Sequence, residues 1–208
     1  MSQVPELVSL GWRLYAAKVA NGLLRPDNEK MMQLHLAQIF QTLAPLYEFS
    51  STESYKVLLE VPVLLGERTK IIDVVLEHSS NGKITKTAIE LKCFRLLGRS
   101  GNGRRGAQNL GMYDYWEDIA SLEGCRALSD YNDAYQLTLT DDSYYVETKH
   151  GGSQVATYST CRSRADVTGK LVHSVANRAG VIALAGTYEM SGWQKDGSFY
   201  FINQKVGT

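Results

Sequence analysis

Two short apolar runs that carry charged residues at strand spacing constrain the fold of this chain more than any other feature. The first run contains Asp73 between isoleucines and valines, and the second, residues 88–92, contains Glu90 and Lys92. A segment of serine, asparagine and glycine at residues 79–83 separates the runs, which predicts a β-hairpin. Because side chains alternate across a strand, Glu90 and Lys92 must project from the same face.

These charges could form a metal-binding catalytic site if the hairpin register sets Asp73 beside Glu90. Two carboxylates and the ammonium of Lys92 would then converge at one point. Carboxylate, carbonyl and phosphate oxygens are the ligands that Mg²⁺ prefers. The bound ion would lower the pKa of a water and neutralise charge on a phosphorane, while Lys92 would orient or deprotonate that water or stabilise the anionic transition state. The pattern predicts a phosphodiesterase site that takes Mg²⁺, with Mn²⁺ as a substitute.

An exposed strand can carry an acid and a lysine by chance, so the surroundings of these residues matter. Both runs are apolar around the charges: Ile72 and Val74 flank Asp73, and Leu91 separates the acid from the lysine of the second run. Charges on such central strands are costly unless they serve a site. The apolar surroundings therefore favour a functional role.

Length and composition are those of an ordinary globular protein. The 208 residues fit one domain, residues 1–208, which is long enough to bury a substantial core. The chain has no apolar run of membrane-spanning length, and its three cysteines include no Cys-x-x-Cys pair. We therefore expect reduced thiols, a cytoplasmic location, no zinc site and no membrane partner.

Periodicity and turn residues divide the chain into helices and strands. Apolar residues recur at steps of three and four after Pro26, which predicts a helix that Pro45 closes. The strand that follows the third helix can lie parallel to the strand of Glu90, because a helical crossover joins them. This order indicates an α/β sandwich with a mixed sheet. The predicted elements are helices over residues 5–22, about 28–46 and 107–123, and strands over 55–64, 69–77, 84–94, 135–139, 181–188 and 199–206.

The layout resembles the PD-(D/E)xK nuclease superfamily, which has the restriction-endonuclease-like fold. Asp73 matches the first acid of the motif, and Glu90 and Lys92 match its second acid and its lysine. Ile72 stands where the name of the motif has proline. The resemblance implies an αβββαβ core with a central mixed sheet flanked by helices.

The resemblance spans about residues 25–140, with strand additions over 141–208, and it implies two further site residues. Members often have a glutamate on the N-terminal helix that contributes to the metal site, and Glu29 is the matching candidate. Its structural alternative is an acid in a first helical turn, which the helix dipole favours. Gln108, together with Tyr113, resembles the glutamine-to-tyrosine motif of the exonuclease branch, and its alternative is a buried structural amide.

Basic residues gather directly after the Glu-x-Lys strand, although the net charge of the chain is zero. Residues 92–105 contain five bases and no acid, whereas residues 112–147 are strongly acidic. Residues 98–106 hold four glycines, so this loop is suited to phosphate contacts, or else is simply flexible and solvated. The candidate nucleic-acid-binding residues are Arg95, Arg99, Arg104 and Arg105.

These features predict a metal-dependent nuclease that hydrolyses phosphodiester bonds of DNA, with RNA also open as a substrate. Asp73 and Glu90 would bind the metal, Lys92 would assist the attacking water, and Glu29 and Gln108 would support the site. Cutting both strands would favour a homodimer. The alternatives are a non-catalytic nucleic-acid-binding or assembly module that keeps the fold, and a glycosidase that uses the paired carboxylates.

Overall fold

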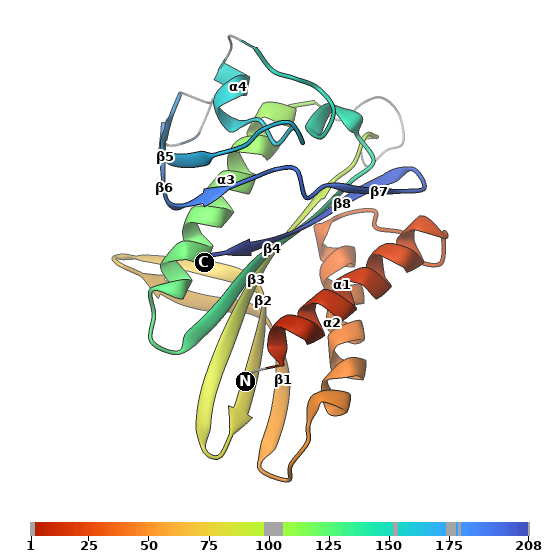
Figure 1. The fold of residues 1–208 in the computed structure, drawn as a ribbon, viewed down its shortest axis with the longest axis vertical. Coiled ribbons are helices and arrows are strands. Elements are labelled where there is room, and N and C mark those ends of the chain that lie inside the picture. Colours follow the sequence, from red (N-terminus) through yellow and green to blue (C-terminus); the bar gives the residue numbers. More distant parts are fainter. Residues whose placement is uncertain (1–2, 98–105, 152–153, 174–177, 179, 208) are drawn as a thin grey trace.

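A mixed six-stranded sheet forms the centre of the protein in the computed structural model, which describes residues 3–97, 106–151, 154–173, 178 and 180–207. The strand order is β1-β2-β3-β4-β8-β7, and only β3 and β4 are parallel neighbours among these strands. Figure 1 shows the strands crossing the middle of the molecule with helices on either side. The strands are β1 (Glu53–Leu65), β2 (Arg68–Ser80), β3 (Lys83–Phe94), β4 (Tyr131–Thr140), β7 (Gln194–Asp196) and β8 (Phe199–Val206).

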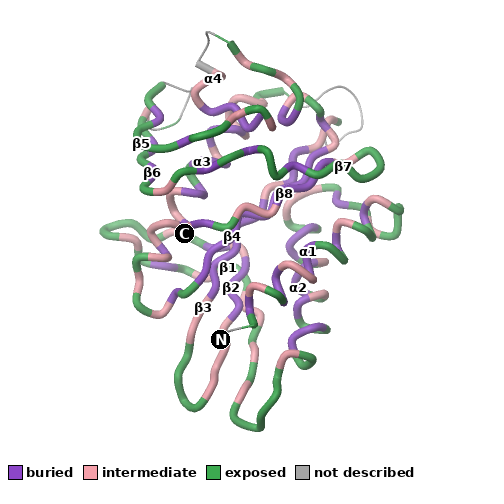
Figure 2. Tube along the Cα trace, in the orientation of Figure 1, coloured by how far each residue is buried: buried purple, intermediate pink, exposed green. Residues whose placement is uncertain are grey.

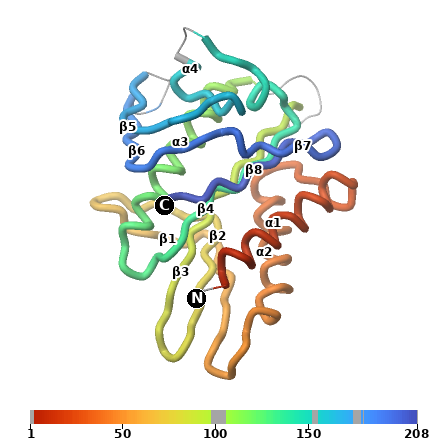
Figure 3. Tube along the Cα trace, in the orientation of Figure 1, coloured from red at the N-terminus to blue at the C-terminus, as the bar shows by residue number. Residues whose placement is uncertain are grey.

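Helices cover both faces of the sheet and give each face its own apolar core (Figures 1 and 3). On one face pack α1 and α2, and on the other pack α3, α4 and a two-stranded sheet of β5 and β6. Figure 2 shows that the buried residues follow the central strands and the inner sides of the helices. These elements are α1 (Val4–Ala20), α2 (Glu29–Leu43), α3 (Gln108–Arg126), α4 (Gln154–Tyr158), β5 (Val167–Val172) and β6 (Val181–Tyr188), with short 3₁₀ turns η1 (Ala44–Tyr47) and η2 (Ser143–Tyr145). Among the described residues, no helix combines the length and the apolar character that a membrane span needs.

The mixed α/β architecture expected from the sequence is confirmed, including the order helix, three strands, helix and strand from α2 to β4. The parallel pairing of β3 with β4 follows from the crossover through α3, because a tight turn cannot join parallel neighbours. β2 and β3 form the expected hairpin, whose turn residues Asn81 and Gly82 have φ values of 50° and 77°. Asparagine and glycine tolerate this left-handed conformation better than other residues, so the turn fixes the register.

Helix α2 begins where the sequence indicates and provides one wall of the candidate site. The side chain of Asn28 caps it by accepting a hydrogen bond from the Met31 N–H (2.9 Å). Leu46, which the sequence places on the apolar stripe of this helix, instead lies in η1 and is exposed, because the helix ends before Pro45. The buried apolar stripe of α2 is Met32, Leu36, Phe40 and Leu43.

The C-terminal part of the chain departs from the expectation drawn from its sequence. The expected strand additions over residues 141–208 are confirmed for β8, which pairs with β4, but β6 pairs with β5 in a separate sheet beside α3. The Glu123 carboxylate on α3 accepts hydrogen bonds from the backbone N–H groups of Ala185 (2.8 Å) and Gly186 (2.6 Å) and from the Tyr188 hydroxyl (2.6 Å). This carboxylate satisfies backbone donors of β6 and so holds the strand against the helix.

The close packing of α1 on α2 provides a test of the fold. A methyl group added at Gly11 would come within 2.8 Å of the Phe40 ring carbon Cδ1. Although alanine is the better helix former by about 1 kcal/mol, Gly11→Ala should lower the free energy of unfolding by about 1–3 kcal/mol because the space is already filled. Urea denaturation measures this change. Gly106→Ala is the control, because a methyl group there meets no atom within 4 Å, and equal stability of the two variants would contradict the described packing.

Candidate functional site

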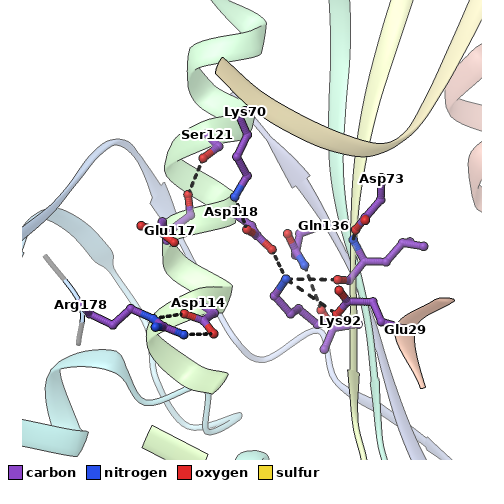
Figure 4. Close-up of polar contacts among 12 residues, drawn as sticks. Glu29, Lys70, Asp73, Lys92, Asp114, Glu117, Asp118, Ser121, Gln136 and Arg178 are labelled. Carbon is purple, nitrogen blue, oxygen red and sulfur yellow. Dashed lines mark hydrogen bonds and ion pairs between the residues drawn. The ribbon is translucent and has the colours of Figure 1, made fainter. Parts of the chain in front are cut away.

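Asp73 lies where strands β2 and β3 stop pairing through their backbones. The ladder between them runs from Ser80 and Lys83 to Val74 and Ile89. Beyond that point, the Asp73 carboxylate oxygen Oδ2 accepts a hydrogen bond from the Leu91 N–H (2.9 Å). The side chain thus replaces a backbone partner and lies directly beside β3 (Figure 4).

Glu90 is the buried partner of Asp73. Its exposed fraction is 3%, and the Asp73 carboxylate meets β3 at the N–H of the next residue, Leu91. Burial, the neighbouring charges of Asp118 and Asp73, and hydrogen bonding to Asp73 raise the pKa of Glu90 well above its usual value, although Lys92 opposes the shift. One oxygen of the side chain, Oε1, has no hydrogen-bond partner. The neutral form of the Glu90 carboxyl group is therefore favoured in the folded protein.

Lys92 projects into a set of oxygen atoms between the sheet and α3 (Figure 4). Its ammonium forms an ion pair with Asp118, lies 3.8 Å from the Glu29 oxygen Oε2 and donates to the Leu91 carbonyl oxygen at 3.3 Å. Burial disfavours the charged form, but the carboxylates of Asp118, Glu29 and Glu90 outweigh it and raise the pKa of Lys92. The ammonium is therefore held in its charged form.

Asp118, a residue that our sequence analysis did not select, completes this cluster from α3. Its side chain is 4% exposed, and its Oδ1 atom lies 3.0 Å from the ammonium of Lys70 on β2. The sequence does contain a signal for it, because Asp118 lies at helical spacing between Tyr115 and Leu122, which are both fully buried. An acid on such an apolar stripe must find a buried partner.

Lys70 is the second residue that the sequence analysis missed. Burial again disfavours its charged form, but the carboxylates of Asp118 and Glu90 outweigh this effect and raise its pKa. Counting Glu29, the cluster brings four carboxyl groups and two ammonium groups together, so acids outnumber bases by two.

Glu29 occupies the first turn of α2 and is only half-buried. Burial raises the pKa of its carboxyl group, and the charges of Asp73 and Asp118 add to the increase while Lys92 opposes it. The structure thus brings Glu29 towards the hairpin charges, and its place in the first turn also suits the helix dipole. The position of Glu29 thus suits the helix dipole, and its contribution to a metal site stays a prediction.

An interruption of the β1–β2 ladder and a glutamine on α2 hold the backbone at Asp73. The ladder leaves Glu60 and Asp73, which face each other in an unshifted register, without a pairing, and the φ of Glu60 is 54°. Gln33, one turn after Glu29, donates its Nε2 hydrogens to the Glu60 oxygen Oε1 (2.6 Å) and to the Asp73 carbonyl oxygen (2.6 Å). Lys30 also pairs with Glu60 at 2.5 Å. Helix α2 is therefore tied to both strands at the point where Asp73 leaves the ladder.

Gln108 has a partner outside this cluster. It is the first residue of α3 and donates to the Asp142 oxygen Oδ2 at 3.5 Å, beyond the end of β4. Tyr113, its companion in the motif expected from the sequence, packs edge-on against the ring of Tyr158. The helical side that meets the hairpin charges is instead that of Asp118, which lies 3.0 Å from the Lys70 ammonium.

The four arginines proposed to contact nucleic acid fall into two groups. Arg95 is engaged within the fold: its guanidinium pairs with Asp141 (2.9 Å), donates to the Pro26 carbonyl oxygen and lies over the Phe199 ring. These contacts give it a structural use. The others, Arg99, Arg104 and Arg105, lie outside the described residues.

A cavity of about 360 Å³ gives access to part of the cluster. Glu29 and Lys92 line it, together with Tyr145, Asp114 and Arg178. Arg178 and Asp114 form a bidentate ion pair on one side of this cavity, with Nε 2.7 Å from Oδ1 and Nη2 2.9 Å from Oδ2. A ligand in the cavity would therefore meet the Lys92 end of the cluster first.

No protein-family model matches this chain, and no curated protein or solved structure is significantly similar to it. Within the described part of the chain, no group of three or more His, Cys, Asp or Glu side chains is arranged to hold a metal ion. The function therefore has to be argued from the geometry of the carboxyl and ammonium groups themselves.

The raised pKa of Glu90 predicts how stability depends on pH. The folded protein binds this proton more tightly than the unfolded chain, so the stabilisation is complete below the unfolded pKa of about 4.3 and is lost as pH rises through the raised folded pKa. Glu90→Gln keeps a neutral group. In chelator at pH 7.5 it should raise the free energy of unfolding by about 1 kcal/mol or more, and by less at pH 5.

Urea denaturation at the two pH values measures this difference. Glu77→Gln is the control, because Glu77 lies on β2 outside the cluster and its partner, the Lys56 ammonium at 3.4 Å, belongs to a side chain that is 65% exposed. Its substitution should change stability little at either pH. A Glu90→Gln protein that is less stable than the wild type at pH 7.5 would show that the carboxyl pair is not strained by its charge.

Proposed function

We propose that this protein is a metal-dependent nuclease that hydrolyses phosphodiester bonds of DNA, with a restriction-endonuclease-like fold of the PD-(D/E)xK type. The observation that carries the proposal is the meeting of the three motif residues at one place on the sheet. The Asp73 carboxylate accepts a hydrogen bond from the N–H of Leu91, the residue between Glu90 and Lys92, and the Lys92 ammonium lies among carboxylates. The element order from α2 to β4 supports it, because it is the αβββαβ order that the resemblance implies. Asp73 would be the first acid of the motif, and Glu90 and Lys92 its second acid and lysine.

The donor set of two carboxylates and one backbone carbonyl would suit a magnesium ion. Asp73 and Glu90 supply carboxyl oxygens, and the Leu91 carbonyl oxygen lies close enough to accept a hydrogen bond from Lys92. The Glu90 oxygen Oε1 is buried without a hydrogen-bond partner, as expected of an atom that has a ligand to bind. Two carboxylates and one carbonyl leave room for waters and phosphate oxygens, which Mg²⁺ usually retains. When bound, the ion would lower the pKa of a water and stabilise charge on the phosphate.

The side chains of the cluster would have separate roles in stabilising charge and in positioning one another. Lys92 would direct its positive charge at the phosphate or the attacking water, because its ammonium is already held in the charged form. Glu29 would hold Lys92 from the cavity side, where its Oε2 atom lies 3.8 Å from the ammonium. Gln33 would keep Asp73 in place through the Asp73 carbonyl oxygen. A phosphodiester would enter through the cavity that Glu29 and Lys92 line.

One observation favours a second candidate, a non-catalytic nucleic-acid-binding or assembly module that keeps the fold. The ammonium of Lys92 is paired with Asp118, and the two side chains are only 13% and 4% exposed. A buried ion pair of this kind can also serve only to fix the structure. This candidate predicts salt-sensitive DNA binding without turnover.

Incubation of the purified protein with supercoiled plasmid and with single-stranded DNA tests the proposal. Cleavage should occur with Mg²⁺ or Mn²⁺ and stop in chelator. Asp73→Asn should reduce the rate by about 100-fold or more, because one electrostatic stabiliser of the reaction is lost. Gel electrophoresis over time measures the rate, and urea denaturation verifies that the variant is folded.

Glu77→Gln is the matched control, because it changes an acid on the same strand outside the cluster. Its rate should equal that of the wild type. Metal-independent cleavage, or an Asp73→Asn protein with the wild-type rate, would refute the proposal. Binding of DNA without any cleavage would support the second candidate.

A further inference from the structure

We propose that Asp118 is a positioning residue that fixes the ammonium of Lys92 in the site, and that Lys70 in turn fixes Asp118. This inference rests on the proposed nuclease function. Asp118 would not touch substrate or metal itself. It would act by keeping the ammonium of Lys92 at one place on the sheet before a phosphate arrives.

Each oxygen of the Asp118 carboxylate has its own ammonium. Oδ1 lies 3.0 Å from Lys70 Nζ, and Oδ2 pairs with Lys92 Nζ. The two lysines come from neighbouring strands, Lys70 from β2 and Lys92 from β3, whereas Asp118 comes from α3 (Figure 4). A carboxylate held at both oxygens cannot rotate freely, so the contact with Lys92 has a defined direction.

The other contacts of Lys92 are weaker than this one. Glu29 lies 3.8 Å away and is half-exposed, and the Leu91 carbonyl oxygen is at 3.3 Å. A lysine side chain has four rotatable bonds and loses considerable entropy when it is held in one geometry. Asp118, at 4% exposure, therefore provides the contact that selects the geometry of Lys92.

The helix that carries Asp118 is itself firmly anchored. Trp116 is fully buried and donates its ring N–H to the Tyr158 carbonyl oxygen (3.0 Å), and Tyr115 and Ile119 are also fully buried. These neighbours fix the backbone of α3 over the sheet. Side chains that are supported in this way hold reactive groups to within a fraction of an ångström.

A charge pair that only stabilises the fold would give a different result from one that positions Lys92. Loss of positioning should lower kcat, because the ammonium would no longer be aligned with the reacting atoms, and should leave KM within about twofold. A purely structural pair would change stability and leave the kcat of the folded protein unchanged. Measurements of kcat and of stability therefore distinguish a positioning role of Asp118 from a purely structural one.

The experiment measures kcat and KM of Asp118→Asn and Asp118→Glu on a DNA substrate that the wild-type protein cleaves. Asp118→Asn should lower kcat by about 100-fold. Asp118→Glu keeps the charge and so keeps Lys92 paired, which allows folding if the asparagine variant fails to fold. Its carboxylate is displaced by one methylene group, so its kcat should fall by about tenfold.

Asp130→Asn is the control, because Asp130 also pairs with a lysine of β3, Lys86 (2.8 Å), but towards the other end of the strand, where the Asp130 side chain is 44% exposed. Its kcat should equal that of the wild type. Wild-type cleavage with an unchanged kcat in folded Asp118→Glu or Asp118→Asn would overturn this inference and leave the proposed function intact. Absence of cleavage by the wild-type protein would overturn both.

Discussion

A buried ammonium needs a counter-charge within reach, and in this protein that requirement links the two layers of the fold. Lys92 lies on a central strand, and its closest partner, Asp118, comes from the helix packed over that strand. The helix is also the crossover that makes β3 and β4 parallel neighbours. The same connection thus sets the topology of the sheet and supplies the charge that makes a lysine tolerable inside it.

The acids of the hairpin show the opposite situation, because Asp73 and Glu90 repel each other when both are charged. The protein accommodates them by giving Asp73 a backbone N–H from the neighbouring strand and by fixing its carbonyl oxygen with Gln33. Such an arrangement is unfavourable for stability alone. Groups of this kind are common at functional sites, where a strained set of charges has a ligand to bind.

The sequence predicts the hairpin well, because alternation and a two-residue turn at Asn81 and Gly82 are local signals. It does not predict the partners of Asp118, since the apolar stripe of α3 marks this acid as buried but only the strands beneath show which lysines it meets. The same limit applies to Arg95, which the sequence assigned to phosphate contacts. Its partner Asp141 is 46 residues away along the chain, and only the parallel pairing of β3 with β4 brings the two together. The separate β5–β6 sheet was missed for a related reason, because β6 is held against α3 by Glu123, which is 62 residues away from Ala185 along the chain.

The backbone of β1 at Glu60, where the ladder with β2 is interrupted, makes opposing demands on one residue. Glu60 adopts a backbone conformation that suits glycine or asparagine better than glutamate, yet its side chain is the acceptor that Gln33 requires. A redesign that optimised only local backbone preference would choose glycine here. That choice would relax the strand, but it would also remove the carboxylate that accepts from the Gln33 amide. This amide connects the N-terminal helical layer to the central strands.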